Sequence, residues 1–356
     1  MIHYFEALDT QGYYIIAEVG VNYYEIGEKY KISPLEAAKL MMKEAKNAGA
    51  DAVKFQTYKA ENLVMVDSPG SWDKNDITVE TQYELFKLYD SFAEAEYREL
   101  SEYARQIGID FMSTPFDEES VDYLDRYMDV YKISSSDISN IPLITRIAKK
   151  NKPIIMSVGA ADLDEIVKSV NLIKSMNDEK LTLLHCVLEY PTPYEHANLK
   201  KIGALRETFP DAIIGYSDHT KPDEHMDVVK TAFLSGAQVI EKHFTLDKSI
   251  KKKNDHFHSM DCDDLRTIKT GFDFIRKLQG SSDLKCLASE VHTRNSVRRS
   301  AVSRCDIEKG TRLTEDMIIF KRPGDGLSPE QAQGLLGKTA KCDIKKDHFL
   351  SNDQFE

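Results

Sequence analysis

The sequence lacks the signatures of several protein classes. Its five cysteines are odd in number and scattered, and none forms a Cys-x-x-Cys pair, which indicates free thiols in a reducing compartment rather than disulfides or a zinc knuckle. No apolar run attains the roughly 18 residues that a membrane span needs. The first residues, MIHYFEALDTQGYY, have neither the basic start nor the apolar stretch of a signal peptide. We therefore expect a cytoplasmic protein with no membrane partner.

Basic residues are not gathered on any long segment. The formal net charge is −12, and lysines and arginines alternate with acidic residues except at 251–253. A nucleic-acid partner is therefore not expected, because binding to a phosphate backbone requires a concentrated basic surface. Hydrophobic residues make up 41% of the 356 residues, which is enough for a large core. The length suits about two domains.

A regular alternation of short apolar runs and longer segments with helical spacing begins near residue 13. Eight such runs predict eight strands, and each is followed by a candidate helix. This is the pattern of a (β/α)8 barrel, also called a TIM barrel, because eight strand–helix pairs fill about 280 residues. The expected strands are 13–19, 52–55, 110–113, 130–133, 153–157, 181–186, 212–217 and 238–243, and the expected helices are 33–49, 93–108, 118–127, 141–150, 162–176, 199–209, 222–236 and 262–279.

The alternative fold is a doubly wound open sheet, but no Gly-x-Gly-x-x-Gly pattern follows the first strand to favour it. The composition changes after residue 280. A polar, serine-rich stretch comes first, followed by short strand-like pieces separated by Gly and Pro. We expect a catalytic barrel at 1–280, a linker at 281–294 and a small β-rich domain at 295–356.

Polar side chains are concentrated at the expected strand ends. In a (β/α)8 barrel these ends converge on one mouth, where active sites are built. Structural strand ends would carry turn formers and at most one lysine, whereas here there are two lysines, three histidines, glutamates and a row of hydroxyls. The residues are Glu18, Asn22, Lys54, Gln56, Ser113, Thr114, Lys132, Ser135, Asp137, Ser157, His185, Tyr190, Ser217, His219, Glu241 and His243.

Two histidines, His219 and His243, follow or end the last two strands. Adjacent strands lie about 5 Å apart, so the two rings can meet above the mouth. Two neutral imidazoles with open positions suit a divalent ion; we expect Mn²⁺, with Mg²⁺, Co²⁺ or iron as alternatives to it. Each histidine alone could instead be a hydrogen-bonded structural residue. The histidines of HFH, residues 256–258, are expected to be solvated loop residues.

A second group of strand-end residues combines lysines with hydroxyls. Ammonium charges and hydroxyl donors together suit a phosphate or a carboxylate. The group consists of Lys54, Lys132, Thr114, Ser135, Ser157 and Ser217. The hydroxyls could instead cap helices, and Lys54 or Lys132 could form a Schiff base, as in barrel aldolases.

Several motifs together resemble the sialic acid synthase family, the enzymes that condense phosphoenolpyruvate with an N-acylated amino sugar. The resemblance extends through nearly the whole chain, in order and at compatible spacing. It is carried by IAEVGVN, AGADAVKFQTYKAENL, STPFD, YKISSSD, PIIMSVG, LLHCVLEYPTPYE, IGYSDHT, IEKHFTLD and KRPGDG.

The resemblance implies a barrel followed by an antifreeze-protein-like (SAF) domain, in a homodimer whose tail domain is swapped over the partner's barrel mouth. It implies that Lys54, Thr114, Lys132, Ser135, Ser157 and Ser217 bind phosphoenolpyruvate and that His219 and His243 bind the metal. On the sugar side it points to Glu18, Gln56, Asp137, Tyr190 and Asp255, with Arg322 supplied by the second subunit. Glu18, Lys54 and Lys132 are the expected catalytic residues.

Three departures from the family pattern concern the sugar side. Tyr23 stands where the family usually has His, and we expect it to be followed by a loop that is longer than in the usual family pattern. Leu188 replaces a residue that is usually polar, and the common Gly-Pro-Asp becomes KKND at 252–255. These changes predict an unusual or less polar acceptor sugar. The candidate acceptors are N-acetylmannosamine and the 2,4-diacetamido-trideoxyhexose precursors of legionaminic and pseudaminic acids. A non-catalytic sugar-binding protein is the other reading, but it would be expected to have lost these strand-end residues.

Overall fold

The computed structural model describes residues 3–70, 79–250 and 255–356. The chain divides into two compact units, Met1–Gly280 and Ser281–Glu356. The first unit contains the eight-stranded sheet, and the second contains a two-stranded sheet. Each unit has its own hydrophobic core.

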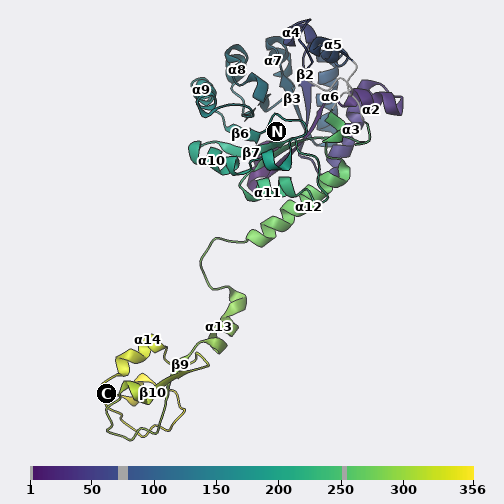
Figure 1. Ribbon diagram of the computed structural model, residues 1–356. Coiled ribbons are helices and arrows are strands. Elements are labelled where there is room, and N and C mark those ends of the chain that lie inside the picture. The colour runs from purple at the N-terminus through teal and green to yellow at the C-terminus, as the bar shows by residue number, and fades with distance from the viewer. Residues whose placement is uncertain (1–2, 71–78, 251–254) are drawn as a thin grey trace. The chain divides into compact units, whose positions relative to one another are not determined.

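The first unit is a (β/α)8 barrel, as predicted (Figure 1). Its strands are all parallel, and their order around the sheet is β3-β2-β1-β8-β7-β6-β5-β4, which is the chain order taken in a circle. The two ends of this order, β3 and β4, contact each other, so the barrel is nearly closed and the open doubly wound sheet is excluded. The strands are β1 (Tyr14–Gly20), β2 (Ala52–Thr57), β3 (Asp110–Pro115), β4 (Tyr131–Ile133), β5 (Ile154–Ser157), β6 (Leu181–Cys186), β7 (Ile213–Asp218) and β8 (Val239–His243).

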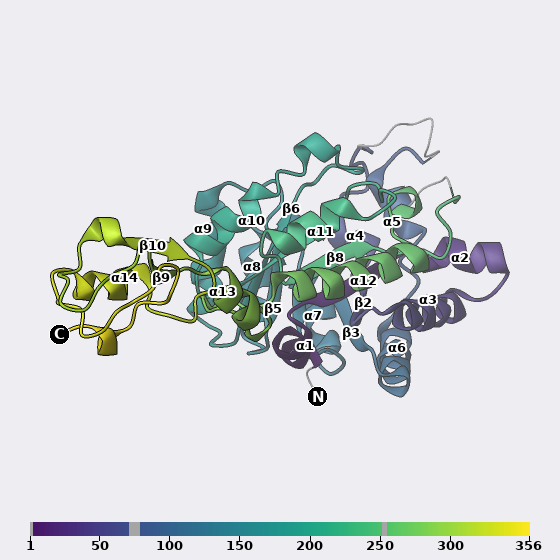
Figure 2. The same ribbon diagram turned by 90° about the horizontal axis from the view of Figure 1, so that it is seen from below.

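The eight predicted helices surround these strands (Figures 1 and 2). The first of them begins after Ser33, the first residue of the expected range, whose side chain accepts a hydrogen bond from the backbone of Glu36, and it ends at Gly49 in a left-handed conformation. Within the described ranges, no helix is long and apolar enough to cross a membrane. The helices are α3 (Pro34–Ala48), α6 (Glu94–Ile107), α7 (Glu118–Leu124), α8 (Ile141–Ala148), α9 (Leu163–Lys174), α10 (Lys200–Thr208), α11 (Asp227–Leu234) and α12 (Cys262–Gln279).

Among the described residues of the first unit, four further helices were not predicted: α1 (His3–Gln11), α2 (Tyr23–Tyr30), α4 (Ala60–Leu63) and α5 (Gln82–Lys87). The expectation of a loop after the first strand was therefore wrong, because α2 occupies that stretch. Helix α1 packs Tyr4 and Leu8 against the apolar layer of the barrel interior, and the Tyr4 hydroxyl lies 2.5 Å from that of Thr182. It thereby closes the end of the barrel at which the strands begin.

The barrel interior changes from apolar to polar along the strands. Alternate residues of a strand face the same side, so every second residue points inward. The lower inward layer is apolar and consists of Ile16, Ala52, Met112, Val130, Ile155, Leu184 and Val239. Two residues further along each strand, the inward positions carry Glu18, Lys54, Thr114, Lys132, Ser157, Cys186 and Glu241. The polar layer therefore lies at the C-terminal ends of the strands, directly above the apolar layer.

The second unit pairs β9 (Ser300–Ser303) with β10 (Ile318–Lys321) in an antiparallel sheet. Its core contains Ala301, Leu313, Leu335 and Leu350, among others. A short helix, α13 (Val291–Val297), begins inside the stretch that we expected to be a linker at 281–294. The remaining short elements of the chain are α14 (Pro329–Ala332) and the 3₁₀ turns Ser135–Asp137, Tyr194–His196, Asp255–Phe257, Ala288–Glu290, Glu315–Met317, Gln333–Leu335 and Asn352–Gln354.

Candidate active site

Strand register brings the charged residues of the polar layer together. Glu18 on β1 is paired in register with Lys54 on β2 and with His243 on β8. The ammonium nitrogen of Lys54 lies 2.5 Å from a Glu18 carboxylate oxygen and donates to the Thr114 hydroxyl at 3.1 Å. Gln56 donates to the other Glu18 oxygen at 3.1 Å. These side chains hold one another in fixed positions at the mouth.

Glu241 links the two lysines of this layer. Its carboxylate oxygens lie 3.7 Å from the Lys54 ammonium and 3.8 Å from that of Lys132, and one of them accepts a hydrogen bond from Ser217 at 3.1 Å. Lys132 also donates to the Ser157 hydroxyl at 2.8 Å. All four charged side chains are buried: Glu18, Lys54, Lys132 and Glu241. Two cations and two anions therefore balance in a small water-poor space.

Burial and neighbouring charges act differently on the two lysines. Burial favours the neutral form of Lys54, but the charges of Glu18 and Glu241 outweigh it and raise the pKa of this ammonium. For Lys132 burial dominates and lowers the pKa, although Glu241 opposes it. Burial raises the pKa of Glu18, whereas Lys132 and Lys54 overcome burial and lower the pKa of Glu241. These shifts favour the charged form of Lys54, and they make Glu18 the carboxylate that protonates more readily than Glu241.

The two predicted metal ligands lie beside each other, with ring centroids 5.5 Å apart. The Nδ1 atom of His219 lies 2.7 Å from the carbonyl oxygen of Val187. Because a carbonyl oxygen only accepts, this contact places the proton on Nδ1 and leaves the lone pair on Nε2. The ring of Tyr190 lies 4.1 Å from that of His219.

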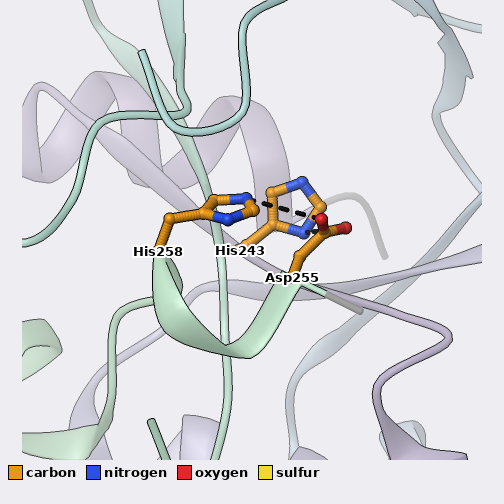
Figure 3. Close-up of side chains that lie close together, drawn as sticks. All are labelled: His243, Asp255 and His258. Carbon is orange, nitrogen blue, oxygen red and sulfur yellow. Dashed lines mark ion pairs between the residues drawn. The ribbon is translucent and has the colours of Figure 1, made fainter. Parts of the chain in front are cut away.

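His243 is buried, and its Nδ1 atom has no hydrogen-bond partner in the described part of the chain. This nitrogen lies 3.5 Å from a carboxylate oxygen of Asp255 (Figure 3). Burial and the charge on His219 hold the pKa of His243 well below its ordinary value. An unpartnered, neutral, buried imidazole next to a carboxylate has the properties of a metal ligand.

A buried ion pair fixes the strand ends that carry these histidines. Lys242 donates to a carboxylate oxygen of Asp218 at 2.6 Å and to the Thr220 carbonyl at 2.7 Å, and both charged side chains are buried. Asp218 and Lys242 immediately precede His219 and His243 and are in register with each other. The pair therefore sets the relative height of the two imidazoles.

Most of the predicted site residues line one cavity at the mouth. They are Glu18, Lys54, Gln56, Thr114, Lys132, Ser135, Ser157, Tyr190, Ser217, His219 and His243. Asp255 contacts His243 from a neighbouring segment. Asp137 is buried but is not among the lining residues, and its carboxylate accepts from Asn140 at 3.0 Å. Arg322 belongs to the second unit.

The three departures have different structural consequences. Tyr23 is fully buried in an aromatic cluster, with its ring 4.7 Å from that of Phe92, so it contributes to the core and not to the lining. Leu188 lines the cavity and is 39% exposed. In the third departure, 252–254 lie outside the described residues. The case for an unusual acceptor therefore rests on Leu188 rather than on Tyr23.

Sequence reasoning underestimated three residues. Glu241 appeared among the strand ends but not among the expected site residues, although its place two residues before His243 indicates an inward position. The histidines of the HFH segment were expected to be solvated, and this was wrong: His256 and His258 are both fully buried. Only their tertiary contacts show this, because local sequence does not distinguish a covered loop from an open one.

Comparisons with known proteins agree with this geometry. The NeuB family model matches residues 41–283, and the SAF domain model matches residues 298–356. The chain belongs to the NeuB family. The resemblance seen in the motifs is therefore confirmed, and this NeuB-family chain is an enzyme of the sialic acid synthase type.

Named relatives of this NeuB-family protein are acid synthases. An N,N'-diacetyllegionaminic acid synthase of Legionella pneumophila is 38% identical, with 96% of this chain and 94% of the relative covered. A second one, from Campylobacter jejuni, is 37% identical over 94% of this chain and 98% of the relative. Among solved structures, the N-acetylneuraminic acid synthetase of Leptospira borgpetersenii, in complex with citrate, has a TM-score of 0.67 and 33% identity, covering 80% of this chain and 92% of that one.

Proposed function

We propose that the protein condenses phosphoenolpyruvate with an N-acetylated amino sugar, giving a nine-carbon 2-keto acid and inorganic phosphate. One observation carries the proposal. Two buried lysines, surrounded by hydroxyls, lie at the floor of a cavity whose upper rim carries two adjacent imidazoles. An anionic substrate and a polarised carbonyl compound would therefore meet at one point above an apolar layer.

Phosphoenolpyruvate fits the lysine end of the cavity. Its phosphate and carboxylate together need at least two cations, and Lys54 and Lys132 are both connected to Glu241. Ser157 and Thr114 already accept hydrogen bonds from these ammonium groups and can turn their own hydroxyl protons to an anion. Such fixed donors in a water-poor site bind an anion more strongly than the same groups would in water.

A divalent metal ion fits the imidazole end. We propose that it is held by His219 through Nε2 and by His243, whose ring has a buried nitrogen without a hydrogen-bond partner among the described residues. Mn²⁺ suits two imidazole donors with open positions for oxygen ligands, with Mg²⁺ or Co²⁺ as alternatives. When bound, such an ion supplies Lewis-acid polarisation of a carbonyl oxygen.

The bond changes of the proposed reaction balance as follows. The C3 carbon of phosphoenolpyruvate forms a bond to the sugar's aldehyde carbon, and water adds at C2. Cleavage of the bond between C2 and the bridging oxygen then releases phosphate and leaves the 2-keto acid. Glu18 accepts one proton of the water, for which its raised pKa suits it, and this proton passes to the oxygen of the former aldehyde, whose C=O π bond breaks in the first step. The water's second proton leaves C2–OH with the phosphate as the ketone forms. Gln56 orients the Glu18 carboxylate. Lys54 and Lys132 neutralise the departing phosphate.

The acceptor that we favour is a 2,4-diacetamido-trideoxyhexose of the legionaminic type. Leu188 offers an apolar surface in the cavity, where a sugar hydroxyl would lose its hydrogen bonds with water and a deoxy position would not. The two legionaminic acid synthases among the relatives point the same way. Tyr190 and Asp255 are the proposed polar contacts of the sugar, together with Asp137. N-acetylmannosamine and the pseudaminic precursor are the alternatives.

The proposed assembly is a homodimer in which the SAF domain of each subunit covers the barrel mouth of the other. Arg322 would then contribute a cation to the sugar side of the opposite site. The proposal rests on the resemblance to the family, since KRPGDG in the second unit is one of the matching motifs.

A Schiff-base aldolase is the second candidate, and one observation favours it: burial lowers the pKa of Lys132, which makes its amine more nucleophilic. Lys54 is unsuited to this role because Glu18 and Glu241 hold it as a cation. Borohydride reduction in the presence of pyruvate would trap an imine on Lys132 if this candidate were right.

Phosphate release tests the proposed reaction directly. The full-length protein is incubated with phosphoenolpyruvate, Mn²⁺ and each of the three sugars, and phosphate and the 2-keto acid are measured. We expect sugar-dependent release, fastest with the legionaminic precursor. Lys132→Met should lower kcat/KM at least about 10-fold, because a charge-assisted hydrogen bond is worth about 1.5–3 kcal/mol. Lys174→Met removes a half-exposed lysine of α9 and should have no effect. Absence of release with every sugar contradicts the proposal.

A further inference from the structure

A third imidazole lies beside the proposed metal ligands. The His258 ring centroid is 5.1 Å from that of His243 and 6.4 Å from that of His219. The side chain is fully buried, and both of its ring nitrogens lack hydrogen-bond partners within the described residues. Buried polar atoms almost always have a partner, so two unpartnered nitrogens on one ring indicate a missing ligand.

His258 and Asp255 come from one short segment and point toward His243 (Figure 3). Residues 255–257 form a 3₁₀ turn, in which side chains three positions apart lie on the same face. The Asp255 carboxylate oxygens lie 3.5 Å from Nδ1 of His243 and 3.7 Å from Nε2 of His258. One ligand atom from each of these three residues lies within 4.8 Å of the others. Small side-chain rotations would bring all three to the spacing of ligands that share an ion about 2.1 Å away.

The segment is attached to the barrel, so its position is not that of a free loop. The backbone of Met260 donates to the His243 carbonyl at 2.8 Å, and Thr245 donates to the Met260 carbonyl at 3.0 Å. The intervening His256 has its Nε2 2.9 Å from a Glu25 carboxylate oxygen on α2 and its Nδ1 2.7 Å from the Thr245 hydroxyl. The Nε2 contact with Glu25 lacks hydrogen-bond geometry, so the His256 ring is held through Nδ1. His256 faces Glu25 and Thr245, whereas His258 has neither ring nitrogen bonded among the described residues and lies beside His243.

We infer that His258 is an additional ligand of the divalent metal, binding it together with His243 and Asp255. This deepens the proposed function, because it adds His258 and Asp255 to the proposed metal ligands and gives Asp255 that role in place of a contact to the sugar. His243, Asp255 and His258 would supply three donors, and His219, whose ring lies 5.5 Å from that of His243, would supply a fourth. A nitrogen-rich set prefers Mn²⁺, Fe²⁺, Co²⁺ or Zn²⁺ and disfavours Mg²⁺, which requires oxygen donors.

Metal titration of the full-length protein tests the inference without using activity. The chelator-treated protein is titrated with Co²⁺, and the visible absorption bands report both the affinity and the change of ligand field. His258→Ala should raise the Kd for Co²⁺ by about 100-fold or more, since even indirect partners of metal ligands contribute 10–100-fold. His225→Ala is the matched control: it removes an exposed imidazole and should leave the Kd within about 2-fold. Mg²⁺ at millimolar concentration should not displace Co²⁺ from the wild-type protein.

A second measurement keeps the inference testable if His258→Ala does not fold. Anomalous diffraction from wild-type crystals soaked with Co²⁺ locates the ion directly. An ion within about 2.4 Å of a His258 nitrogen supports the inference, and an ion bound only by His219 and His243 overturns it. An unchanged Kd and spectrum in folded His258→Ala also overturn it. Loss of Co²⁺ affinity in that variant, in a protein that releases no phosphate with any sugar, would instead contradict the proposed function while supporting the metal site.

Discussion

Replacing Lys242 by Met isolates the ion pair that positions the two strand ends. Lys242 is fully buried and donates to Asp218 at 2.6 Å. Met has a similar length without the charge, so the variant removes the cation and leaves the Asp218 carboxylate buried. Breaking a buried pair in this way typically costs about 3–5 kcal/mol of unfolding free energy.

The structure places this variant at the lower end of that range. Asp218 keeps three other donors: the Tyr216 hydroxyl at 3.0 Å, and the backbone and hydroxyl of Thr220 at 3.0 and 3.1 Å. We therefore expect a loss of about 3 kcal/mol, which corresponds to a fall in Tm of about 6 °C for a unit of this size. The Co²⁺ affinity should fall as well, because His219 and His243 are the next residues of the two strands.

Urea unfolding followed by circular dichroism measures the loss, and a double-mutant cycle assigns it to the pair. Asp218→Asn combined with Lys242→Met removes both charges and should recover part of the stability lost in Lys242→Met alone. Lys345→Met is the control, because it breaks an exposed pair with Asp306 and should not change the unfolding midpoint.

The same pair predicts a dependence on pH. Burial alone would raise the pKa of Asp218, but Lys242 and the other donors outweigh it and lower the pKa. A lowered folded-state pKa stabilises the protein above the ordinary carboxyl pKa of about 4, and the stabilisation is lost as the pH falls through the folded-state value. In Lys242→Met the carboxylate is unpaired and protonates more readily. The difference between the two proteins should therefore shrink as the pH falls from 7 toward 4. This account would be refuted if the difference in unfolding free energy stayed constant over this pH range. It would also be refuted if the double variant lost more unfolding free energy than the two single variants together.

Three further outcomes are expected. Glu18→Gln should fold normally and lose turnover by about 100-fold or more, measured as phosphate release, because general acid–base catalysis typically contributes 10²–10⁴-fold; full activity would exclude Glu18 as the base. Phe272→Ala should lower the unfolding free energy by about 3–5 kcal/mol, since the Phe272 ring is buried on α12. Phe274→Ala on the same helix removes an exposed ring and should change urea unfolding little, so equal effects would contradict the packing. Tyr4→Phe should cost about 1–3 kcal/mol in the same assay by leaving the buried Thr182 hydroxyl unpaired, and no loss would show that α1 does not close the barrel.

Much of the site could be predicted from strand periodicity. Once Lys54 and Lys132 are recognised as inward residues near strand ends, the closure of the barrel brings them to one mouth without further information. The same reasoning predicted the adjacency of His219 and His243, whose rings are neighbours in the structure. The family resemblance supplied the reaction, because periodicity does not specify a substrate.

Residues on connecting segments were predicted less well. The stretch after β1 was expected to be a loop, yet it forms the short helix α2, whose Glu25 pairs with His256. Tyr23 was expected near the sugar and is in the aromatic core instead. His258 was expected in solvent because a short polar segment carries no sign of what will cover it. These outcomes depend on contacts between different segments of the chain, such as those of Glu25 with His256, Tyr23 with Phe92 and His258 with His219, which local sequence does not encode.

The sequence by itself determined which residues face the barrel interior, since a period of two and a count of eight strands leave little choice of side. Tertiary structure alone decided how those residues interact: that Glu241 connects two lysines, that Asp218 and Lys242 fix the height of two imidazoles, and that His258 joins them. The physical reason is that periodicity specifies direction, whereas distance, burial and the resulting pKa values depend on which strand or loop comes to lie alongside.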